Sequence, residues 1–323
     1  MDPTLRFLLY IIFSALSLAG GYLCRKRQLL NPAVSKPLHY HTVVWVWSAA
    51  SLFSVWKIPL SRDHLWLGLF QTLIVALLAF TALGIARGFK FSRDQSAIVA
   101  VAASIHNIGF TLGAYICYTL ITPADSALAL GIYYVSIMQV VAVIVIYPLA
   151  RRYGHEHDPS VPLSRLMIKN FLDLRAMPLY AAVAGTLLAT YNVPYPQFVR
   201  DFAVLDILFY LGAFGAYFGI GLHLELTFRK PDLKVHALAA ALKFLLIPAL
   251  TLLMIWLLAL AGQSLSRPAY EVALVQSAMP TALWTPMLAN LFGLNHRLAV
   301  SVWFYNHVLF ALLILPIILF LYR

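Results

Sequence analysis

The chain has 323 residues, of which 62% are hydrophobic and only 11% are charged, and its mean hydropathy is +0.83. A soluble domain carries roughly 25% charged residues, so this composition excludes an ordinary soluble enzyme and indicates an integral membrane protein. The net charge of +11 does not point to nucleic acid as a partner, because basic residues in a multi-pass membrane protein mainly set its orientation.

Ten apolar stretches are long enough to cross a bilayer as helices, each of which takes about 20 residues. The first stretch has no positively charged leader and no small-residue cleavage site, so we expect it to be a retained span. The sequence therefore predicts an all-α, multi-pass membrane protein with ten transmembrane segments. In chain order, the segments cover approximately residues 4–24, 38–56, 64–87, 95–120, 125–150, 174–192, 200–224, 233–262, 267–292 and 296–322.

The basic residues are distributed unevenly between the two sides of this arrangement. Sixteen of them follow odd-numbered segments, whereas six lie on the other side. Because basic loops stay in the cytoplasm, we expect both termini to be extracytoplasmic and the short linker at 151–173 to be cytoplasmic. The expected location is a cell membrane, plasma or inner.

Segment four has polar and flexible residues halfway along an apolar stretch. Within VAASIHNIGFTLGAY (101–115), His106 and Asn107 are followed by Gly109 and Gly113. A helix in lipid must satisfy its own backbone hydrogen bonds, so this cluster predicts a break. A kinked helix that only packs closely is the alternative, since Gly and Pro are common in membrane helices.

The halves 1–150 and 174–323 are predicted to be inverted repeats of five segments each, because the sixth segment enters opposite to the first. VAASIHNIGF of segment four can be aligned with LVQSAMPTAL of segment nine. This alignment pairs Ser104 with Ser277. It also pairs Asn107 with Pro280, which removes a backbone donor and predicts a break in segment nine.

Paired broken segments at equivalent positions indicate the binding site of a transporter. Amides at the N-termini of broken helices attract anions, so we expect a polar, anion-attracting site where the breaks cross. Segments five and ten also carry polar residues in mid-span. The candidate lining residues from the sequence alone are Ser104, His106, Gln139, Ser277 and Asn306.

Lys243 lies about ten residues into segment eight, where a charge costs on the order of 2.5–3.5 kcal/mol. Either it snorkels toward the cytoplasmic interface, or it has a functional place near the crossing. Near helix N-termini it would add to a positive field, which favours an anionic substrate over a metal cation. We therefore expect Lys243 to compensate charge and to couple its protonation to transport.

Three stretches resemble the auxin efflux carrier family, which includes the plant PIN exporters and bacterial carriers of small organic acids. They are NIGF in segment four, LKFLLIPAL in segment eight and QSAMPTA…NLFGLNHRLA in segments nine and ten. The run Ala-Met-Pro-Thr-Ala at 278–282 is the most specific. The short linker resembles the compact bacterial-type members, whereas Ala114 and Tyr115 stand near the usual place of a proline.

The resemblance implies a scaffold of segments 1, 2, 6 and 7 and a mobile transport unit of segments 3–5 and 8–10. It also implies a homodimer that pairs through its scaffold helices, and an elevator-type movement of the transport unit. Carried over residue by residue, the crossover positions are Asn107 and Gly109 with Pro280 and Thr281.

The favoured function is therefore a secondary carrier of a small organic anion, and three other functions are compared with it. A sodium-coupled organic-anion symporter of the bile-acid carrier type has a similar architecture, although Lys243 disfavours a nearby sodium ion. An enzyme is not expected, because the chain has no HExxH, GxSxG or paired catalytic carboxylates. The absence of a phosphate-binding loop argues against direct drive by ATP, and the two cysteines indicate no metal site. No cofactor is expected. A receptor or scaffold without transport stays open.

Overall fold

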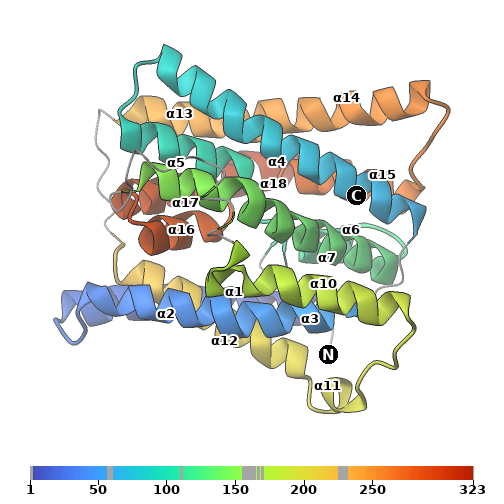
Figure 1. The fold of residues 1–323 in the computed structure, drawn as a ribbon, viewed down its shortest axis with the longest axis horizontal. Helices are drawn as coiled ribbons and strands as arrows, with labels where there is room; N and C mark the ends of the chain where they lie inside the picture. Colours follow the sequence, from blue (N-terminus) through green and yellow to red (C-terminus); the bar gives the residue numbers. More distant parts are fainter. Residues whose placement is uncertain are drawn as a thin grey trace. The chain divides into compact units, whose positions relative to one another are not determined.

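The computed structural model describes residues 3–56, 61–109, 112–154, 165, 168, 171–224 and 232–322. The regular structure of this part of the chain is helical, apart from one isolated β-bridge (Figure 1). Six of its helices are long and apolar enough to cross a membrane, and the protein is a multi-pass membrane protein. These helices are Leu8–Lys26, Arg62–Gly88, Ser126–Tyr153, Val204–Gly221, Leu233–Leu260 and His296–Leu321.

The chain divides into two compact units. Unit 1 consists of Met1–Leu60, Ala142–Glu225 and Pro286–Arg297. Unit 2 consists of Ser61–Val141, Leu226–Thr285 and Leu298–Arg323. Nearly all of the linker predicted at 151–173 lies outside the described residues.

Unit 1 contains two helix pairs, α1 with α12 and α3 with α10. A Cβ atom on Gly21 of α1 would lie 2.1 Å from the carbonyl oxygen of Phe218, and one on Gly221 of α12 would lie 2.2 Å from that of Leu18. Glycine at these positions lets two backbones touch, as small residues do between membrane helices. The helices are α1 (Pro3–Lys26), η1 (Pro32–Val34), α2 (Ser35–His41), η2 (Thr42–Trp47), α3 (Ser48–Trp56), η3 (Ala142–Ile146), α8 (Tyr147–Tyr153), η4 (Leu174–Ala176), α10 (Met177–Thr190), α11 (Gln197–Asp201) and α12 (Val204–Gly221).

Unit 2 is built around α5, whose side chains are buried from Ser96 to Ser104. A capping box begins this helix: Gln95 N donates to Ser92 Oγ at 3.2 Å, and Ser92 N donates to Gln95 Oε1 at 3.1 Å. The helices are α4 (Arg62–Gly88), α5 (Arg93–Ser104), α6 (Gly113–Leu120), α7 (Ala124–Val141), α13 (Leu233–Ala241), η6 (Leu242–Leu246), α14 (Ile247–Leu260), α15 (Arg267–Ser277), η7 (Phe310–Ile314) and α18 (Leu315–Leu321). Two further helices, α16 (Trp284–Phe292) and α17 (His296–Leu309), each have residues in both units.

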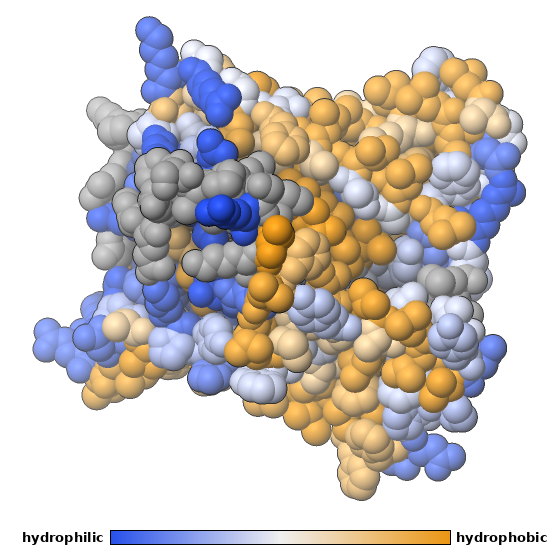
Figure 2. All heavy atoms as spheres, viewed as in Figure 1, coloured by the Kyte–Doolittle hydropathy of each residue, from blue (hydrophilic) through white to orange (hydrophobic). Residues whose placement is uncertain are grey.

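Large apolar side chains are exposed on many of these helices. Leu16 of α1, Phe80 of α4, Leu260 of α14 and Phe320 of α18 are examples. Figure 2 shows apolar residues over much of the face in view. Exposed apolar surface on this scale is unusual for a protein in water, and it is expected of helices that face lipid.

Candidate functional site

Two helix breaks lie in unit 2, at the positions that the sequence predicts. Segment four is split into α5, which ends at Ser104, and α6, which begins at Gly113. Segment nine is split into α15, which ends at Ser277, and α16, which begins at Trp284. The aligned residues Ser104 and Ser277 are therefore each the last residue of a half-helix.

The two breaks meet at an isolated β-bridge. His106 and Thr281 form an antiparallel bridge. Asn107 N donates to Pro280 O at 2.7 Å. Ala282 N donates to Ile105 O at 3.1 Å. Backbone groups that leave a helix inside a membrane protein need other partners, and here each break supplies them to the other.

The crossing is asymmetric because Pro280 has no amide hydrogen. It accepts a hydrogen bond from Asn107 and cannot return one. Asn107 O accepts instead from Gly113 N at 3.0 Å, which ties the break to the first residue of α6. A Cβ atom at Gly113 would lie 2.2 Å from Gln276 Oε1 and 2.8 Å from the Cα of Ile108, so only glycine fits there.

Polar side chains hold the strand of segment nine. Thr281 Oγ1 donates to Ala102 O at 3.0 Å. Thr281 N donates to Asn306 Oδ1 at 3.3 Å. Gln276 Nε2 donates to Ile108 O at 3.1 Å. Gln276 was not predicted from the sequence, because a single glutamine in an apolar segment gives no periodic signal.

Lys243 lies at the C-terminal end of α5. Its side chain is fully buried, and Nζ donates to Ala103 O and Ile105 O, both at 2.9 Å. Nζ also lies 3.3 Å from His106 Nδ1. Lys243 therefore does not snorkel toward an interface. The expectation that it lies near helix N-termini is wrong, because its neighbours are carbonyl oxygens at the C-terminus of α5.

His307 is a packed histidine with both ring nitrogens bonded. Nδ1 lies 2.9 Å from Trp303 O, which can only accept, so Nδ1 carries the hydrogen. Nε2 lies 3.0 Å from Asn107 Nδ2 and therefore accepts from that amide. His307 thus orients Asn107 at the crossing.

His106 is different, because one ring nitrogen has no partner. When Lys243 is protonated, Nδ1 accepts from its ammonium group at 3.3 Å, and the hydrogen of the neutral ring is then on Nε2. Nε2 is buried, and within the described part of the chain it makes no hydrogen bond. It is one of several buried side-chain nitrogen and oxygen atoms without a partner among the described residues, and it is the one that lies at the crossing.

The remaining predicted residues have local or unassigned roles. The hydroxyl groups of Ser104 and Ser277 donate to Ala100 O and Leu274 O of their own helices, both at 2.7 Å. Gln139 is buried on α7, which packs against α15 and α6.

Gly109 closes the start of α6. Its carbonyl oxygen accepts from Leu112 N at 3.1 Å and Ala114 N at 3.0 Å. Gly113 N is bonded to Asn107 O, as described above. The amides of residues 112–114 therefore already have partners inside the chain, and the expectation of free N-terminal amides does not hold at this end of α6.

Unit 2 also has a cavity of about 950 Å³. Its lining includes Ser277 and Ala278, at the broken end of α15, and apolar residues of α14 and α18. Arg267 and Glu271 also line the cavity and form an ion pair, in which Arg267 Nε lies 2.9 Å from Glu271 Oε1. The cavity thus reaches one edge of the crossing.

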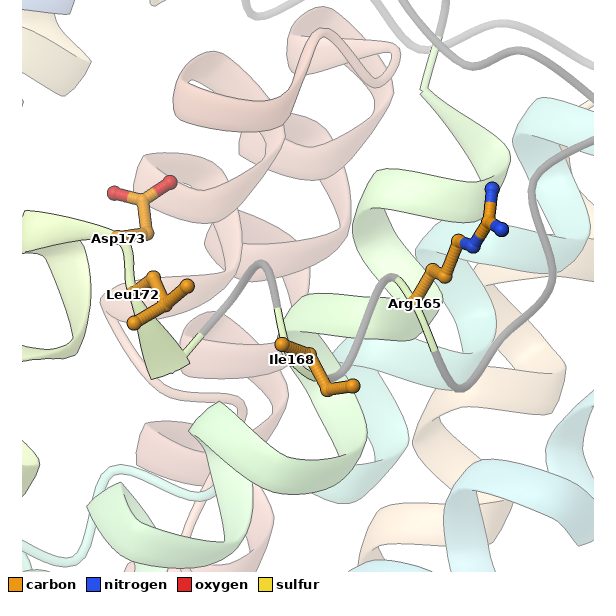
Figure 3. Close-up of a pocket in the computed structure, with 4 residues that line it drawn as sticks. All are labelled: Arg165, Ile168, Leu172 and Asp173. Atoms are coloured by element: carbon orange, nitrogen blue, oxygen red, sulfur yellow. The ribbon is translucent and has the colours of Figure 1, made fainter.

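A second cavity, of about 450 Å³, lies in unit 1 and is lined by Arg165, Ile168, Leu172 and Asp173. Figure 3 shows Arg165 and Asp173 apart from each other, on either side of Ile168. Asp173 is already paired with Arg151 and Arg175. None of the candidate site residues lines this cavity, so it is not the site considered further.

The chain was compared with known proteins. The sequence profile of a family described as membrane transport protein matches residues 11–319, almost the whole chain. A search of curated proteins found no match. The profile spans both halves and every stretch on which the resemblance was based. The chain belongs to the auxin efflux carrier family of membrane transport proteins.

Proposed function

We propose that the chain is a secondary active transporter or exporter of a small organic anion, a carboxylate such as an auxin-like acid, which binds at the crossing in unit 2. The observation that carries the proposal is the crossing itself, where two helix breaks are bridged at His106 and Thr281 and are surrounded by buried polar side chains. When the hydrogen of the neutral His106 ring is on Nε2, that N–H group can donate to a carboxylate.

The proposal includes a ten-segment inverted repeat. It is supported by Ser104 and Ser277, which end α5 and α15 at aligned positions. It is also supported by the ends of segments five and ten. Each contains a π-helix, η3 or η7, that is followed by a short helix with proline in its first turn.

An elevator mechanism requires two bodies that can move as wholes. The two compact units supply candidates, with unit 1 as the scaffold and unit 2 as the transport unit. This division differs from the expected one in that residues 142–150 of segment five and 286–292 of segment nine belong to unit 1. Segments 1, 2, 6 and 7 lie in unit 1, and the crossing lies in unit 2. In this proposal two copies of the chain pair through their scaffold helices as a homodimer.

The orientation in a plasma or inner membrane is part of the same proposal. With both termini extracytoplasmic and 151–173 cytoplasmic, single cysteines introduced at positions 2 and 160 react with impermeant reagents from opposite sides. Labelling of both from one side would contradict the ten-segment arrangement.

The function is tested by flux in proteoliposomes against a panel of carboxylates, including indole-3-acetate, with sodium and pH varied separately. We expect at least one carboxylate to be transported without sodium. A strict sodium requirement would favour the symporter of the bile-acid carrier type. Flux of none of the carboxylates would favour a receptor or scaffold.

A further inference from the structure

The carbonyl oxygens at the end of α5 have an unusual partner. A helix C-terminus carries a partial negative charge and several carbonyl groups without intrahelical partners. At α5, Ala103 O and Ile105 O both point to Lys243 Nζ, at 2.9 Å, and the side chain is fully buried. The open end of α5 inside the membrane segment is thus closed by a lysine side chain from another part of unit 2.

The number of hydrogen bonds fits an ammonium group. Lysine has three N–H donors and no acceptor. Two donors are used by the carbonyl groups and the third by His106 Nδ1, at 3.3 Å. Within the described residues no carboxylate pairs with Lys243. The positive charge is therefore compensated by backbone dipoles, as it is for a cation bound to carbonyl oxygens.

The local backbone places the lysine for this role. Lys243 lies in the π-helix η6 between α13 and α14. A π-bulge is frequently found at functional sites, because the extra residue re-aims the side chains of its turn. The helix that precedes it, α13, packs directly against α5.

We propose that Ala103 O, Ile105 O and His106 Nδ1 form a site for a primary ammonium or similar monovalent cation, which Lys243 fills from within the chain. The site keeps the crossing closed without any bound metal ion. The inference deepens the proposed function, since it explains how such a carrier would work without sodium. Its test measures thermal stability and needs neither substrate nor flux, so it can fail or succeed independently of the proposed function.

The test is chemical rescue of Lys243→Ala, purified as the full chain in detergent. The atoms removed by this substitution correspond to n-propylammonium. We expect a lower midpoint of thermal unfolding than for the wild type, and a saturable rise of a few degrees with n-propylammonium, because a ligand that binds only the folded state stabilises it. Tetramethylammonium has no N–H donor and should have no such effect.

The exposed Lys234, on the adjoining helix α13, provides the matched control. Lys234→Ala and the wild type should not respond to n-propylammonium, because the site remains filled by Lys243. An equal rise in all three proteins, or no rise specific to n-propylammonium in Lys243→Ala, would overturn the proposal.

If Lys243→Ala does not fold, a second pair of variants decides. Lys243→Arg keeps a positive charge and several donors, whereas Lys243→Gln keeps hydrogen bonding and loses the charge. We expect Lys243→Arg to give more folded protein by size-exclusion chromatography and a higher unfolding midpoint than Lys243→Gln. Equal or reversed behaviour would show that the site does not require a cation.

Discussion

The two helix breaks at the crossing are held in different ways. The break after α5 is closed by a charge, since Lys243 Nζ binds the carbonyl oxygens of Ala103 and Ile105. The break after α15 is held by neutral groups, Thr281 with Ala102 O and Asn306 with Thr281 N. The two breaks, which lie at aligned positions of the sequence, are thus held by different side chains.

This difference between the two breaks suggests which of them contacts the substrate. The charged half also contains His106, whose Nε2 has no partner among the described residues. The neutral half contains Pro280, which accepts but cannot donate. We infer that the α5 side binds the anion and that the α15 side shapes the site, and this division can be tested by substitutions in each half.

The largest effect on transport is expected from Asn107→Ala and Pro280→Ala. The first removes the amide that binds His307 Nε2, at 3.0 Å. The second adds an N–H group opposite Asn107, whose carbonyl already accepts from Gly113 N. We expect each to lower the flux roughly tenfold or more, which corresponds to about 1.4 kcal/mol.

Expression level and size-exclusion profile serve as the controls for these two variants. Both should stay near those of the wild type, because each variant keeps the backbone hydrogen bond from Asn107 N to the carbonyl oxygen at position 280. Aggregation of both variants would mean that the polar residues serve only the fold.

Gly113→Ala should destabilise the protein by about 1–3 kcal/mol, as overpacking does. The added Cβ would lie 2.8 Å from the Cα of Ile108, which is backbone and cannot rotate away. Gly109→Ala is the matched control, because a Cβ there lies at an ordinary 3.5 Å from Val135 Cγ2. Equal unfolding midpoints for the two variants would show that α5 and α6 are not as tightly joined as described.

Thr281→Val tests the neutral half, with an expected loss of about 1 kcal/mol for one buried hydrogen bond. It leaves Ala102 O without its side-chain donor. Thr251→Val is the control in the same unit, since Thr251 Oγ1 is buried and makes no hydrogen bond with any described residue. Thr251→Val should leave the unfolding midpoint unchanged or raise it. A drop as large as that of Thr281→Val would show that the hydrogen bond to Ala102 O is not the cause of the loss.

The smallest effects are expected from Ser104→Ala and Ser277→Ala, at under about 1 kcal/mol each. Both hydroxyl groups bond to carbonyl oxygens of their own helices, so neither is needed across the crossing. Transport assays of both variants should resemble the wild type. A strong loss in one of them would identify that serine as a contact of the substrate.

Much of this architecture was predictable because membrane helices tolerate few polar residues. His106, Asn107 and Pro280 stood out in apolar segments, and the structure has breaks at all three. The aligned residues Ser104 and Ser277, predicted as lining residues, are the last residues of α5 and α15. Gln276 was missed because a single glutamine in a span has no periodic signal, and its bond to Ile108 O joins residues 168 positions apart.

Composition and pattern alone determined that the chain is a multi-pass helical protein and where its helices break, since both follow from local transfer energies and backbone donors. The sequence also marked Lys243 as costly in lipid. Only the tertiary structure decided what compensates it, because its partners lie 138 and 140 residues away along the chain. Long-range hydrogen bonds depend on how helices pack, and no local pattern encodes which carbonyl group a buried ammonium will meet.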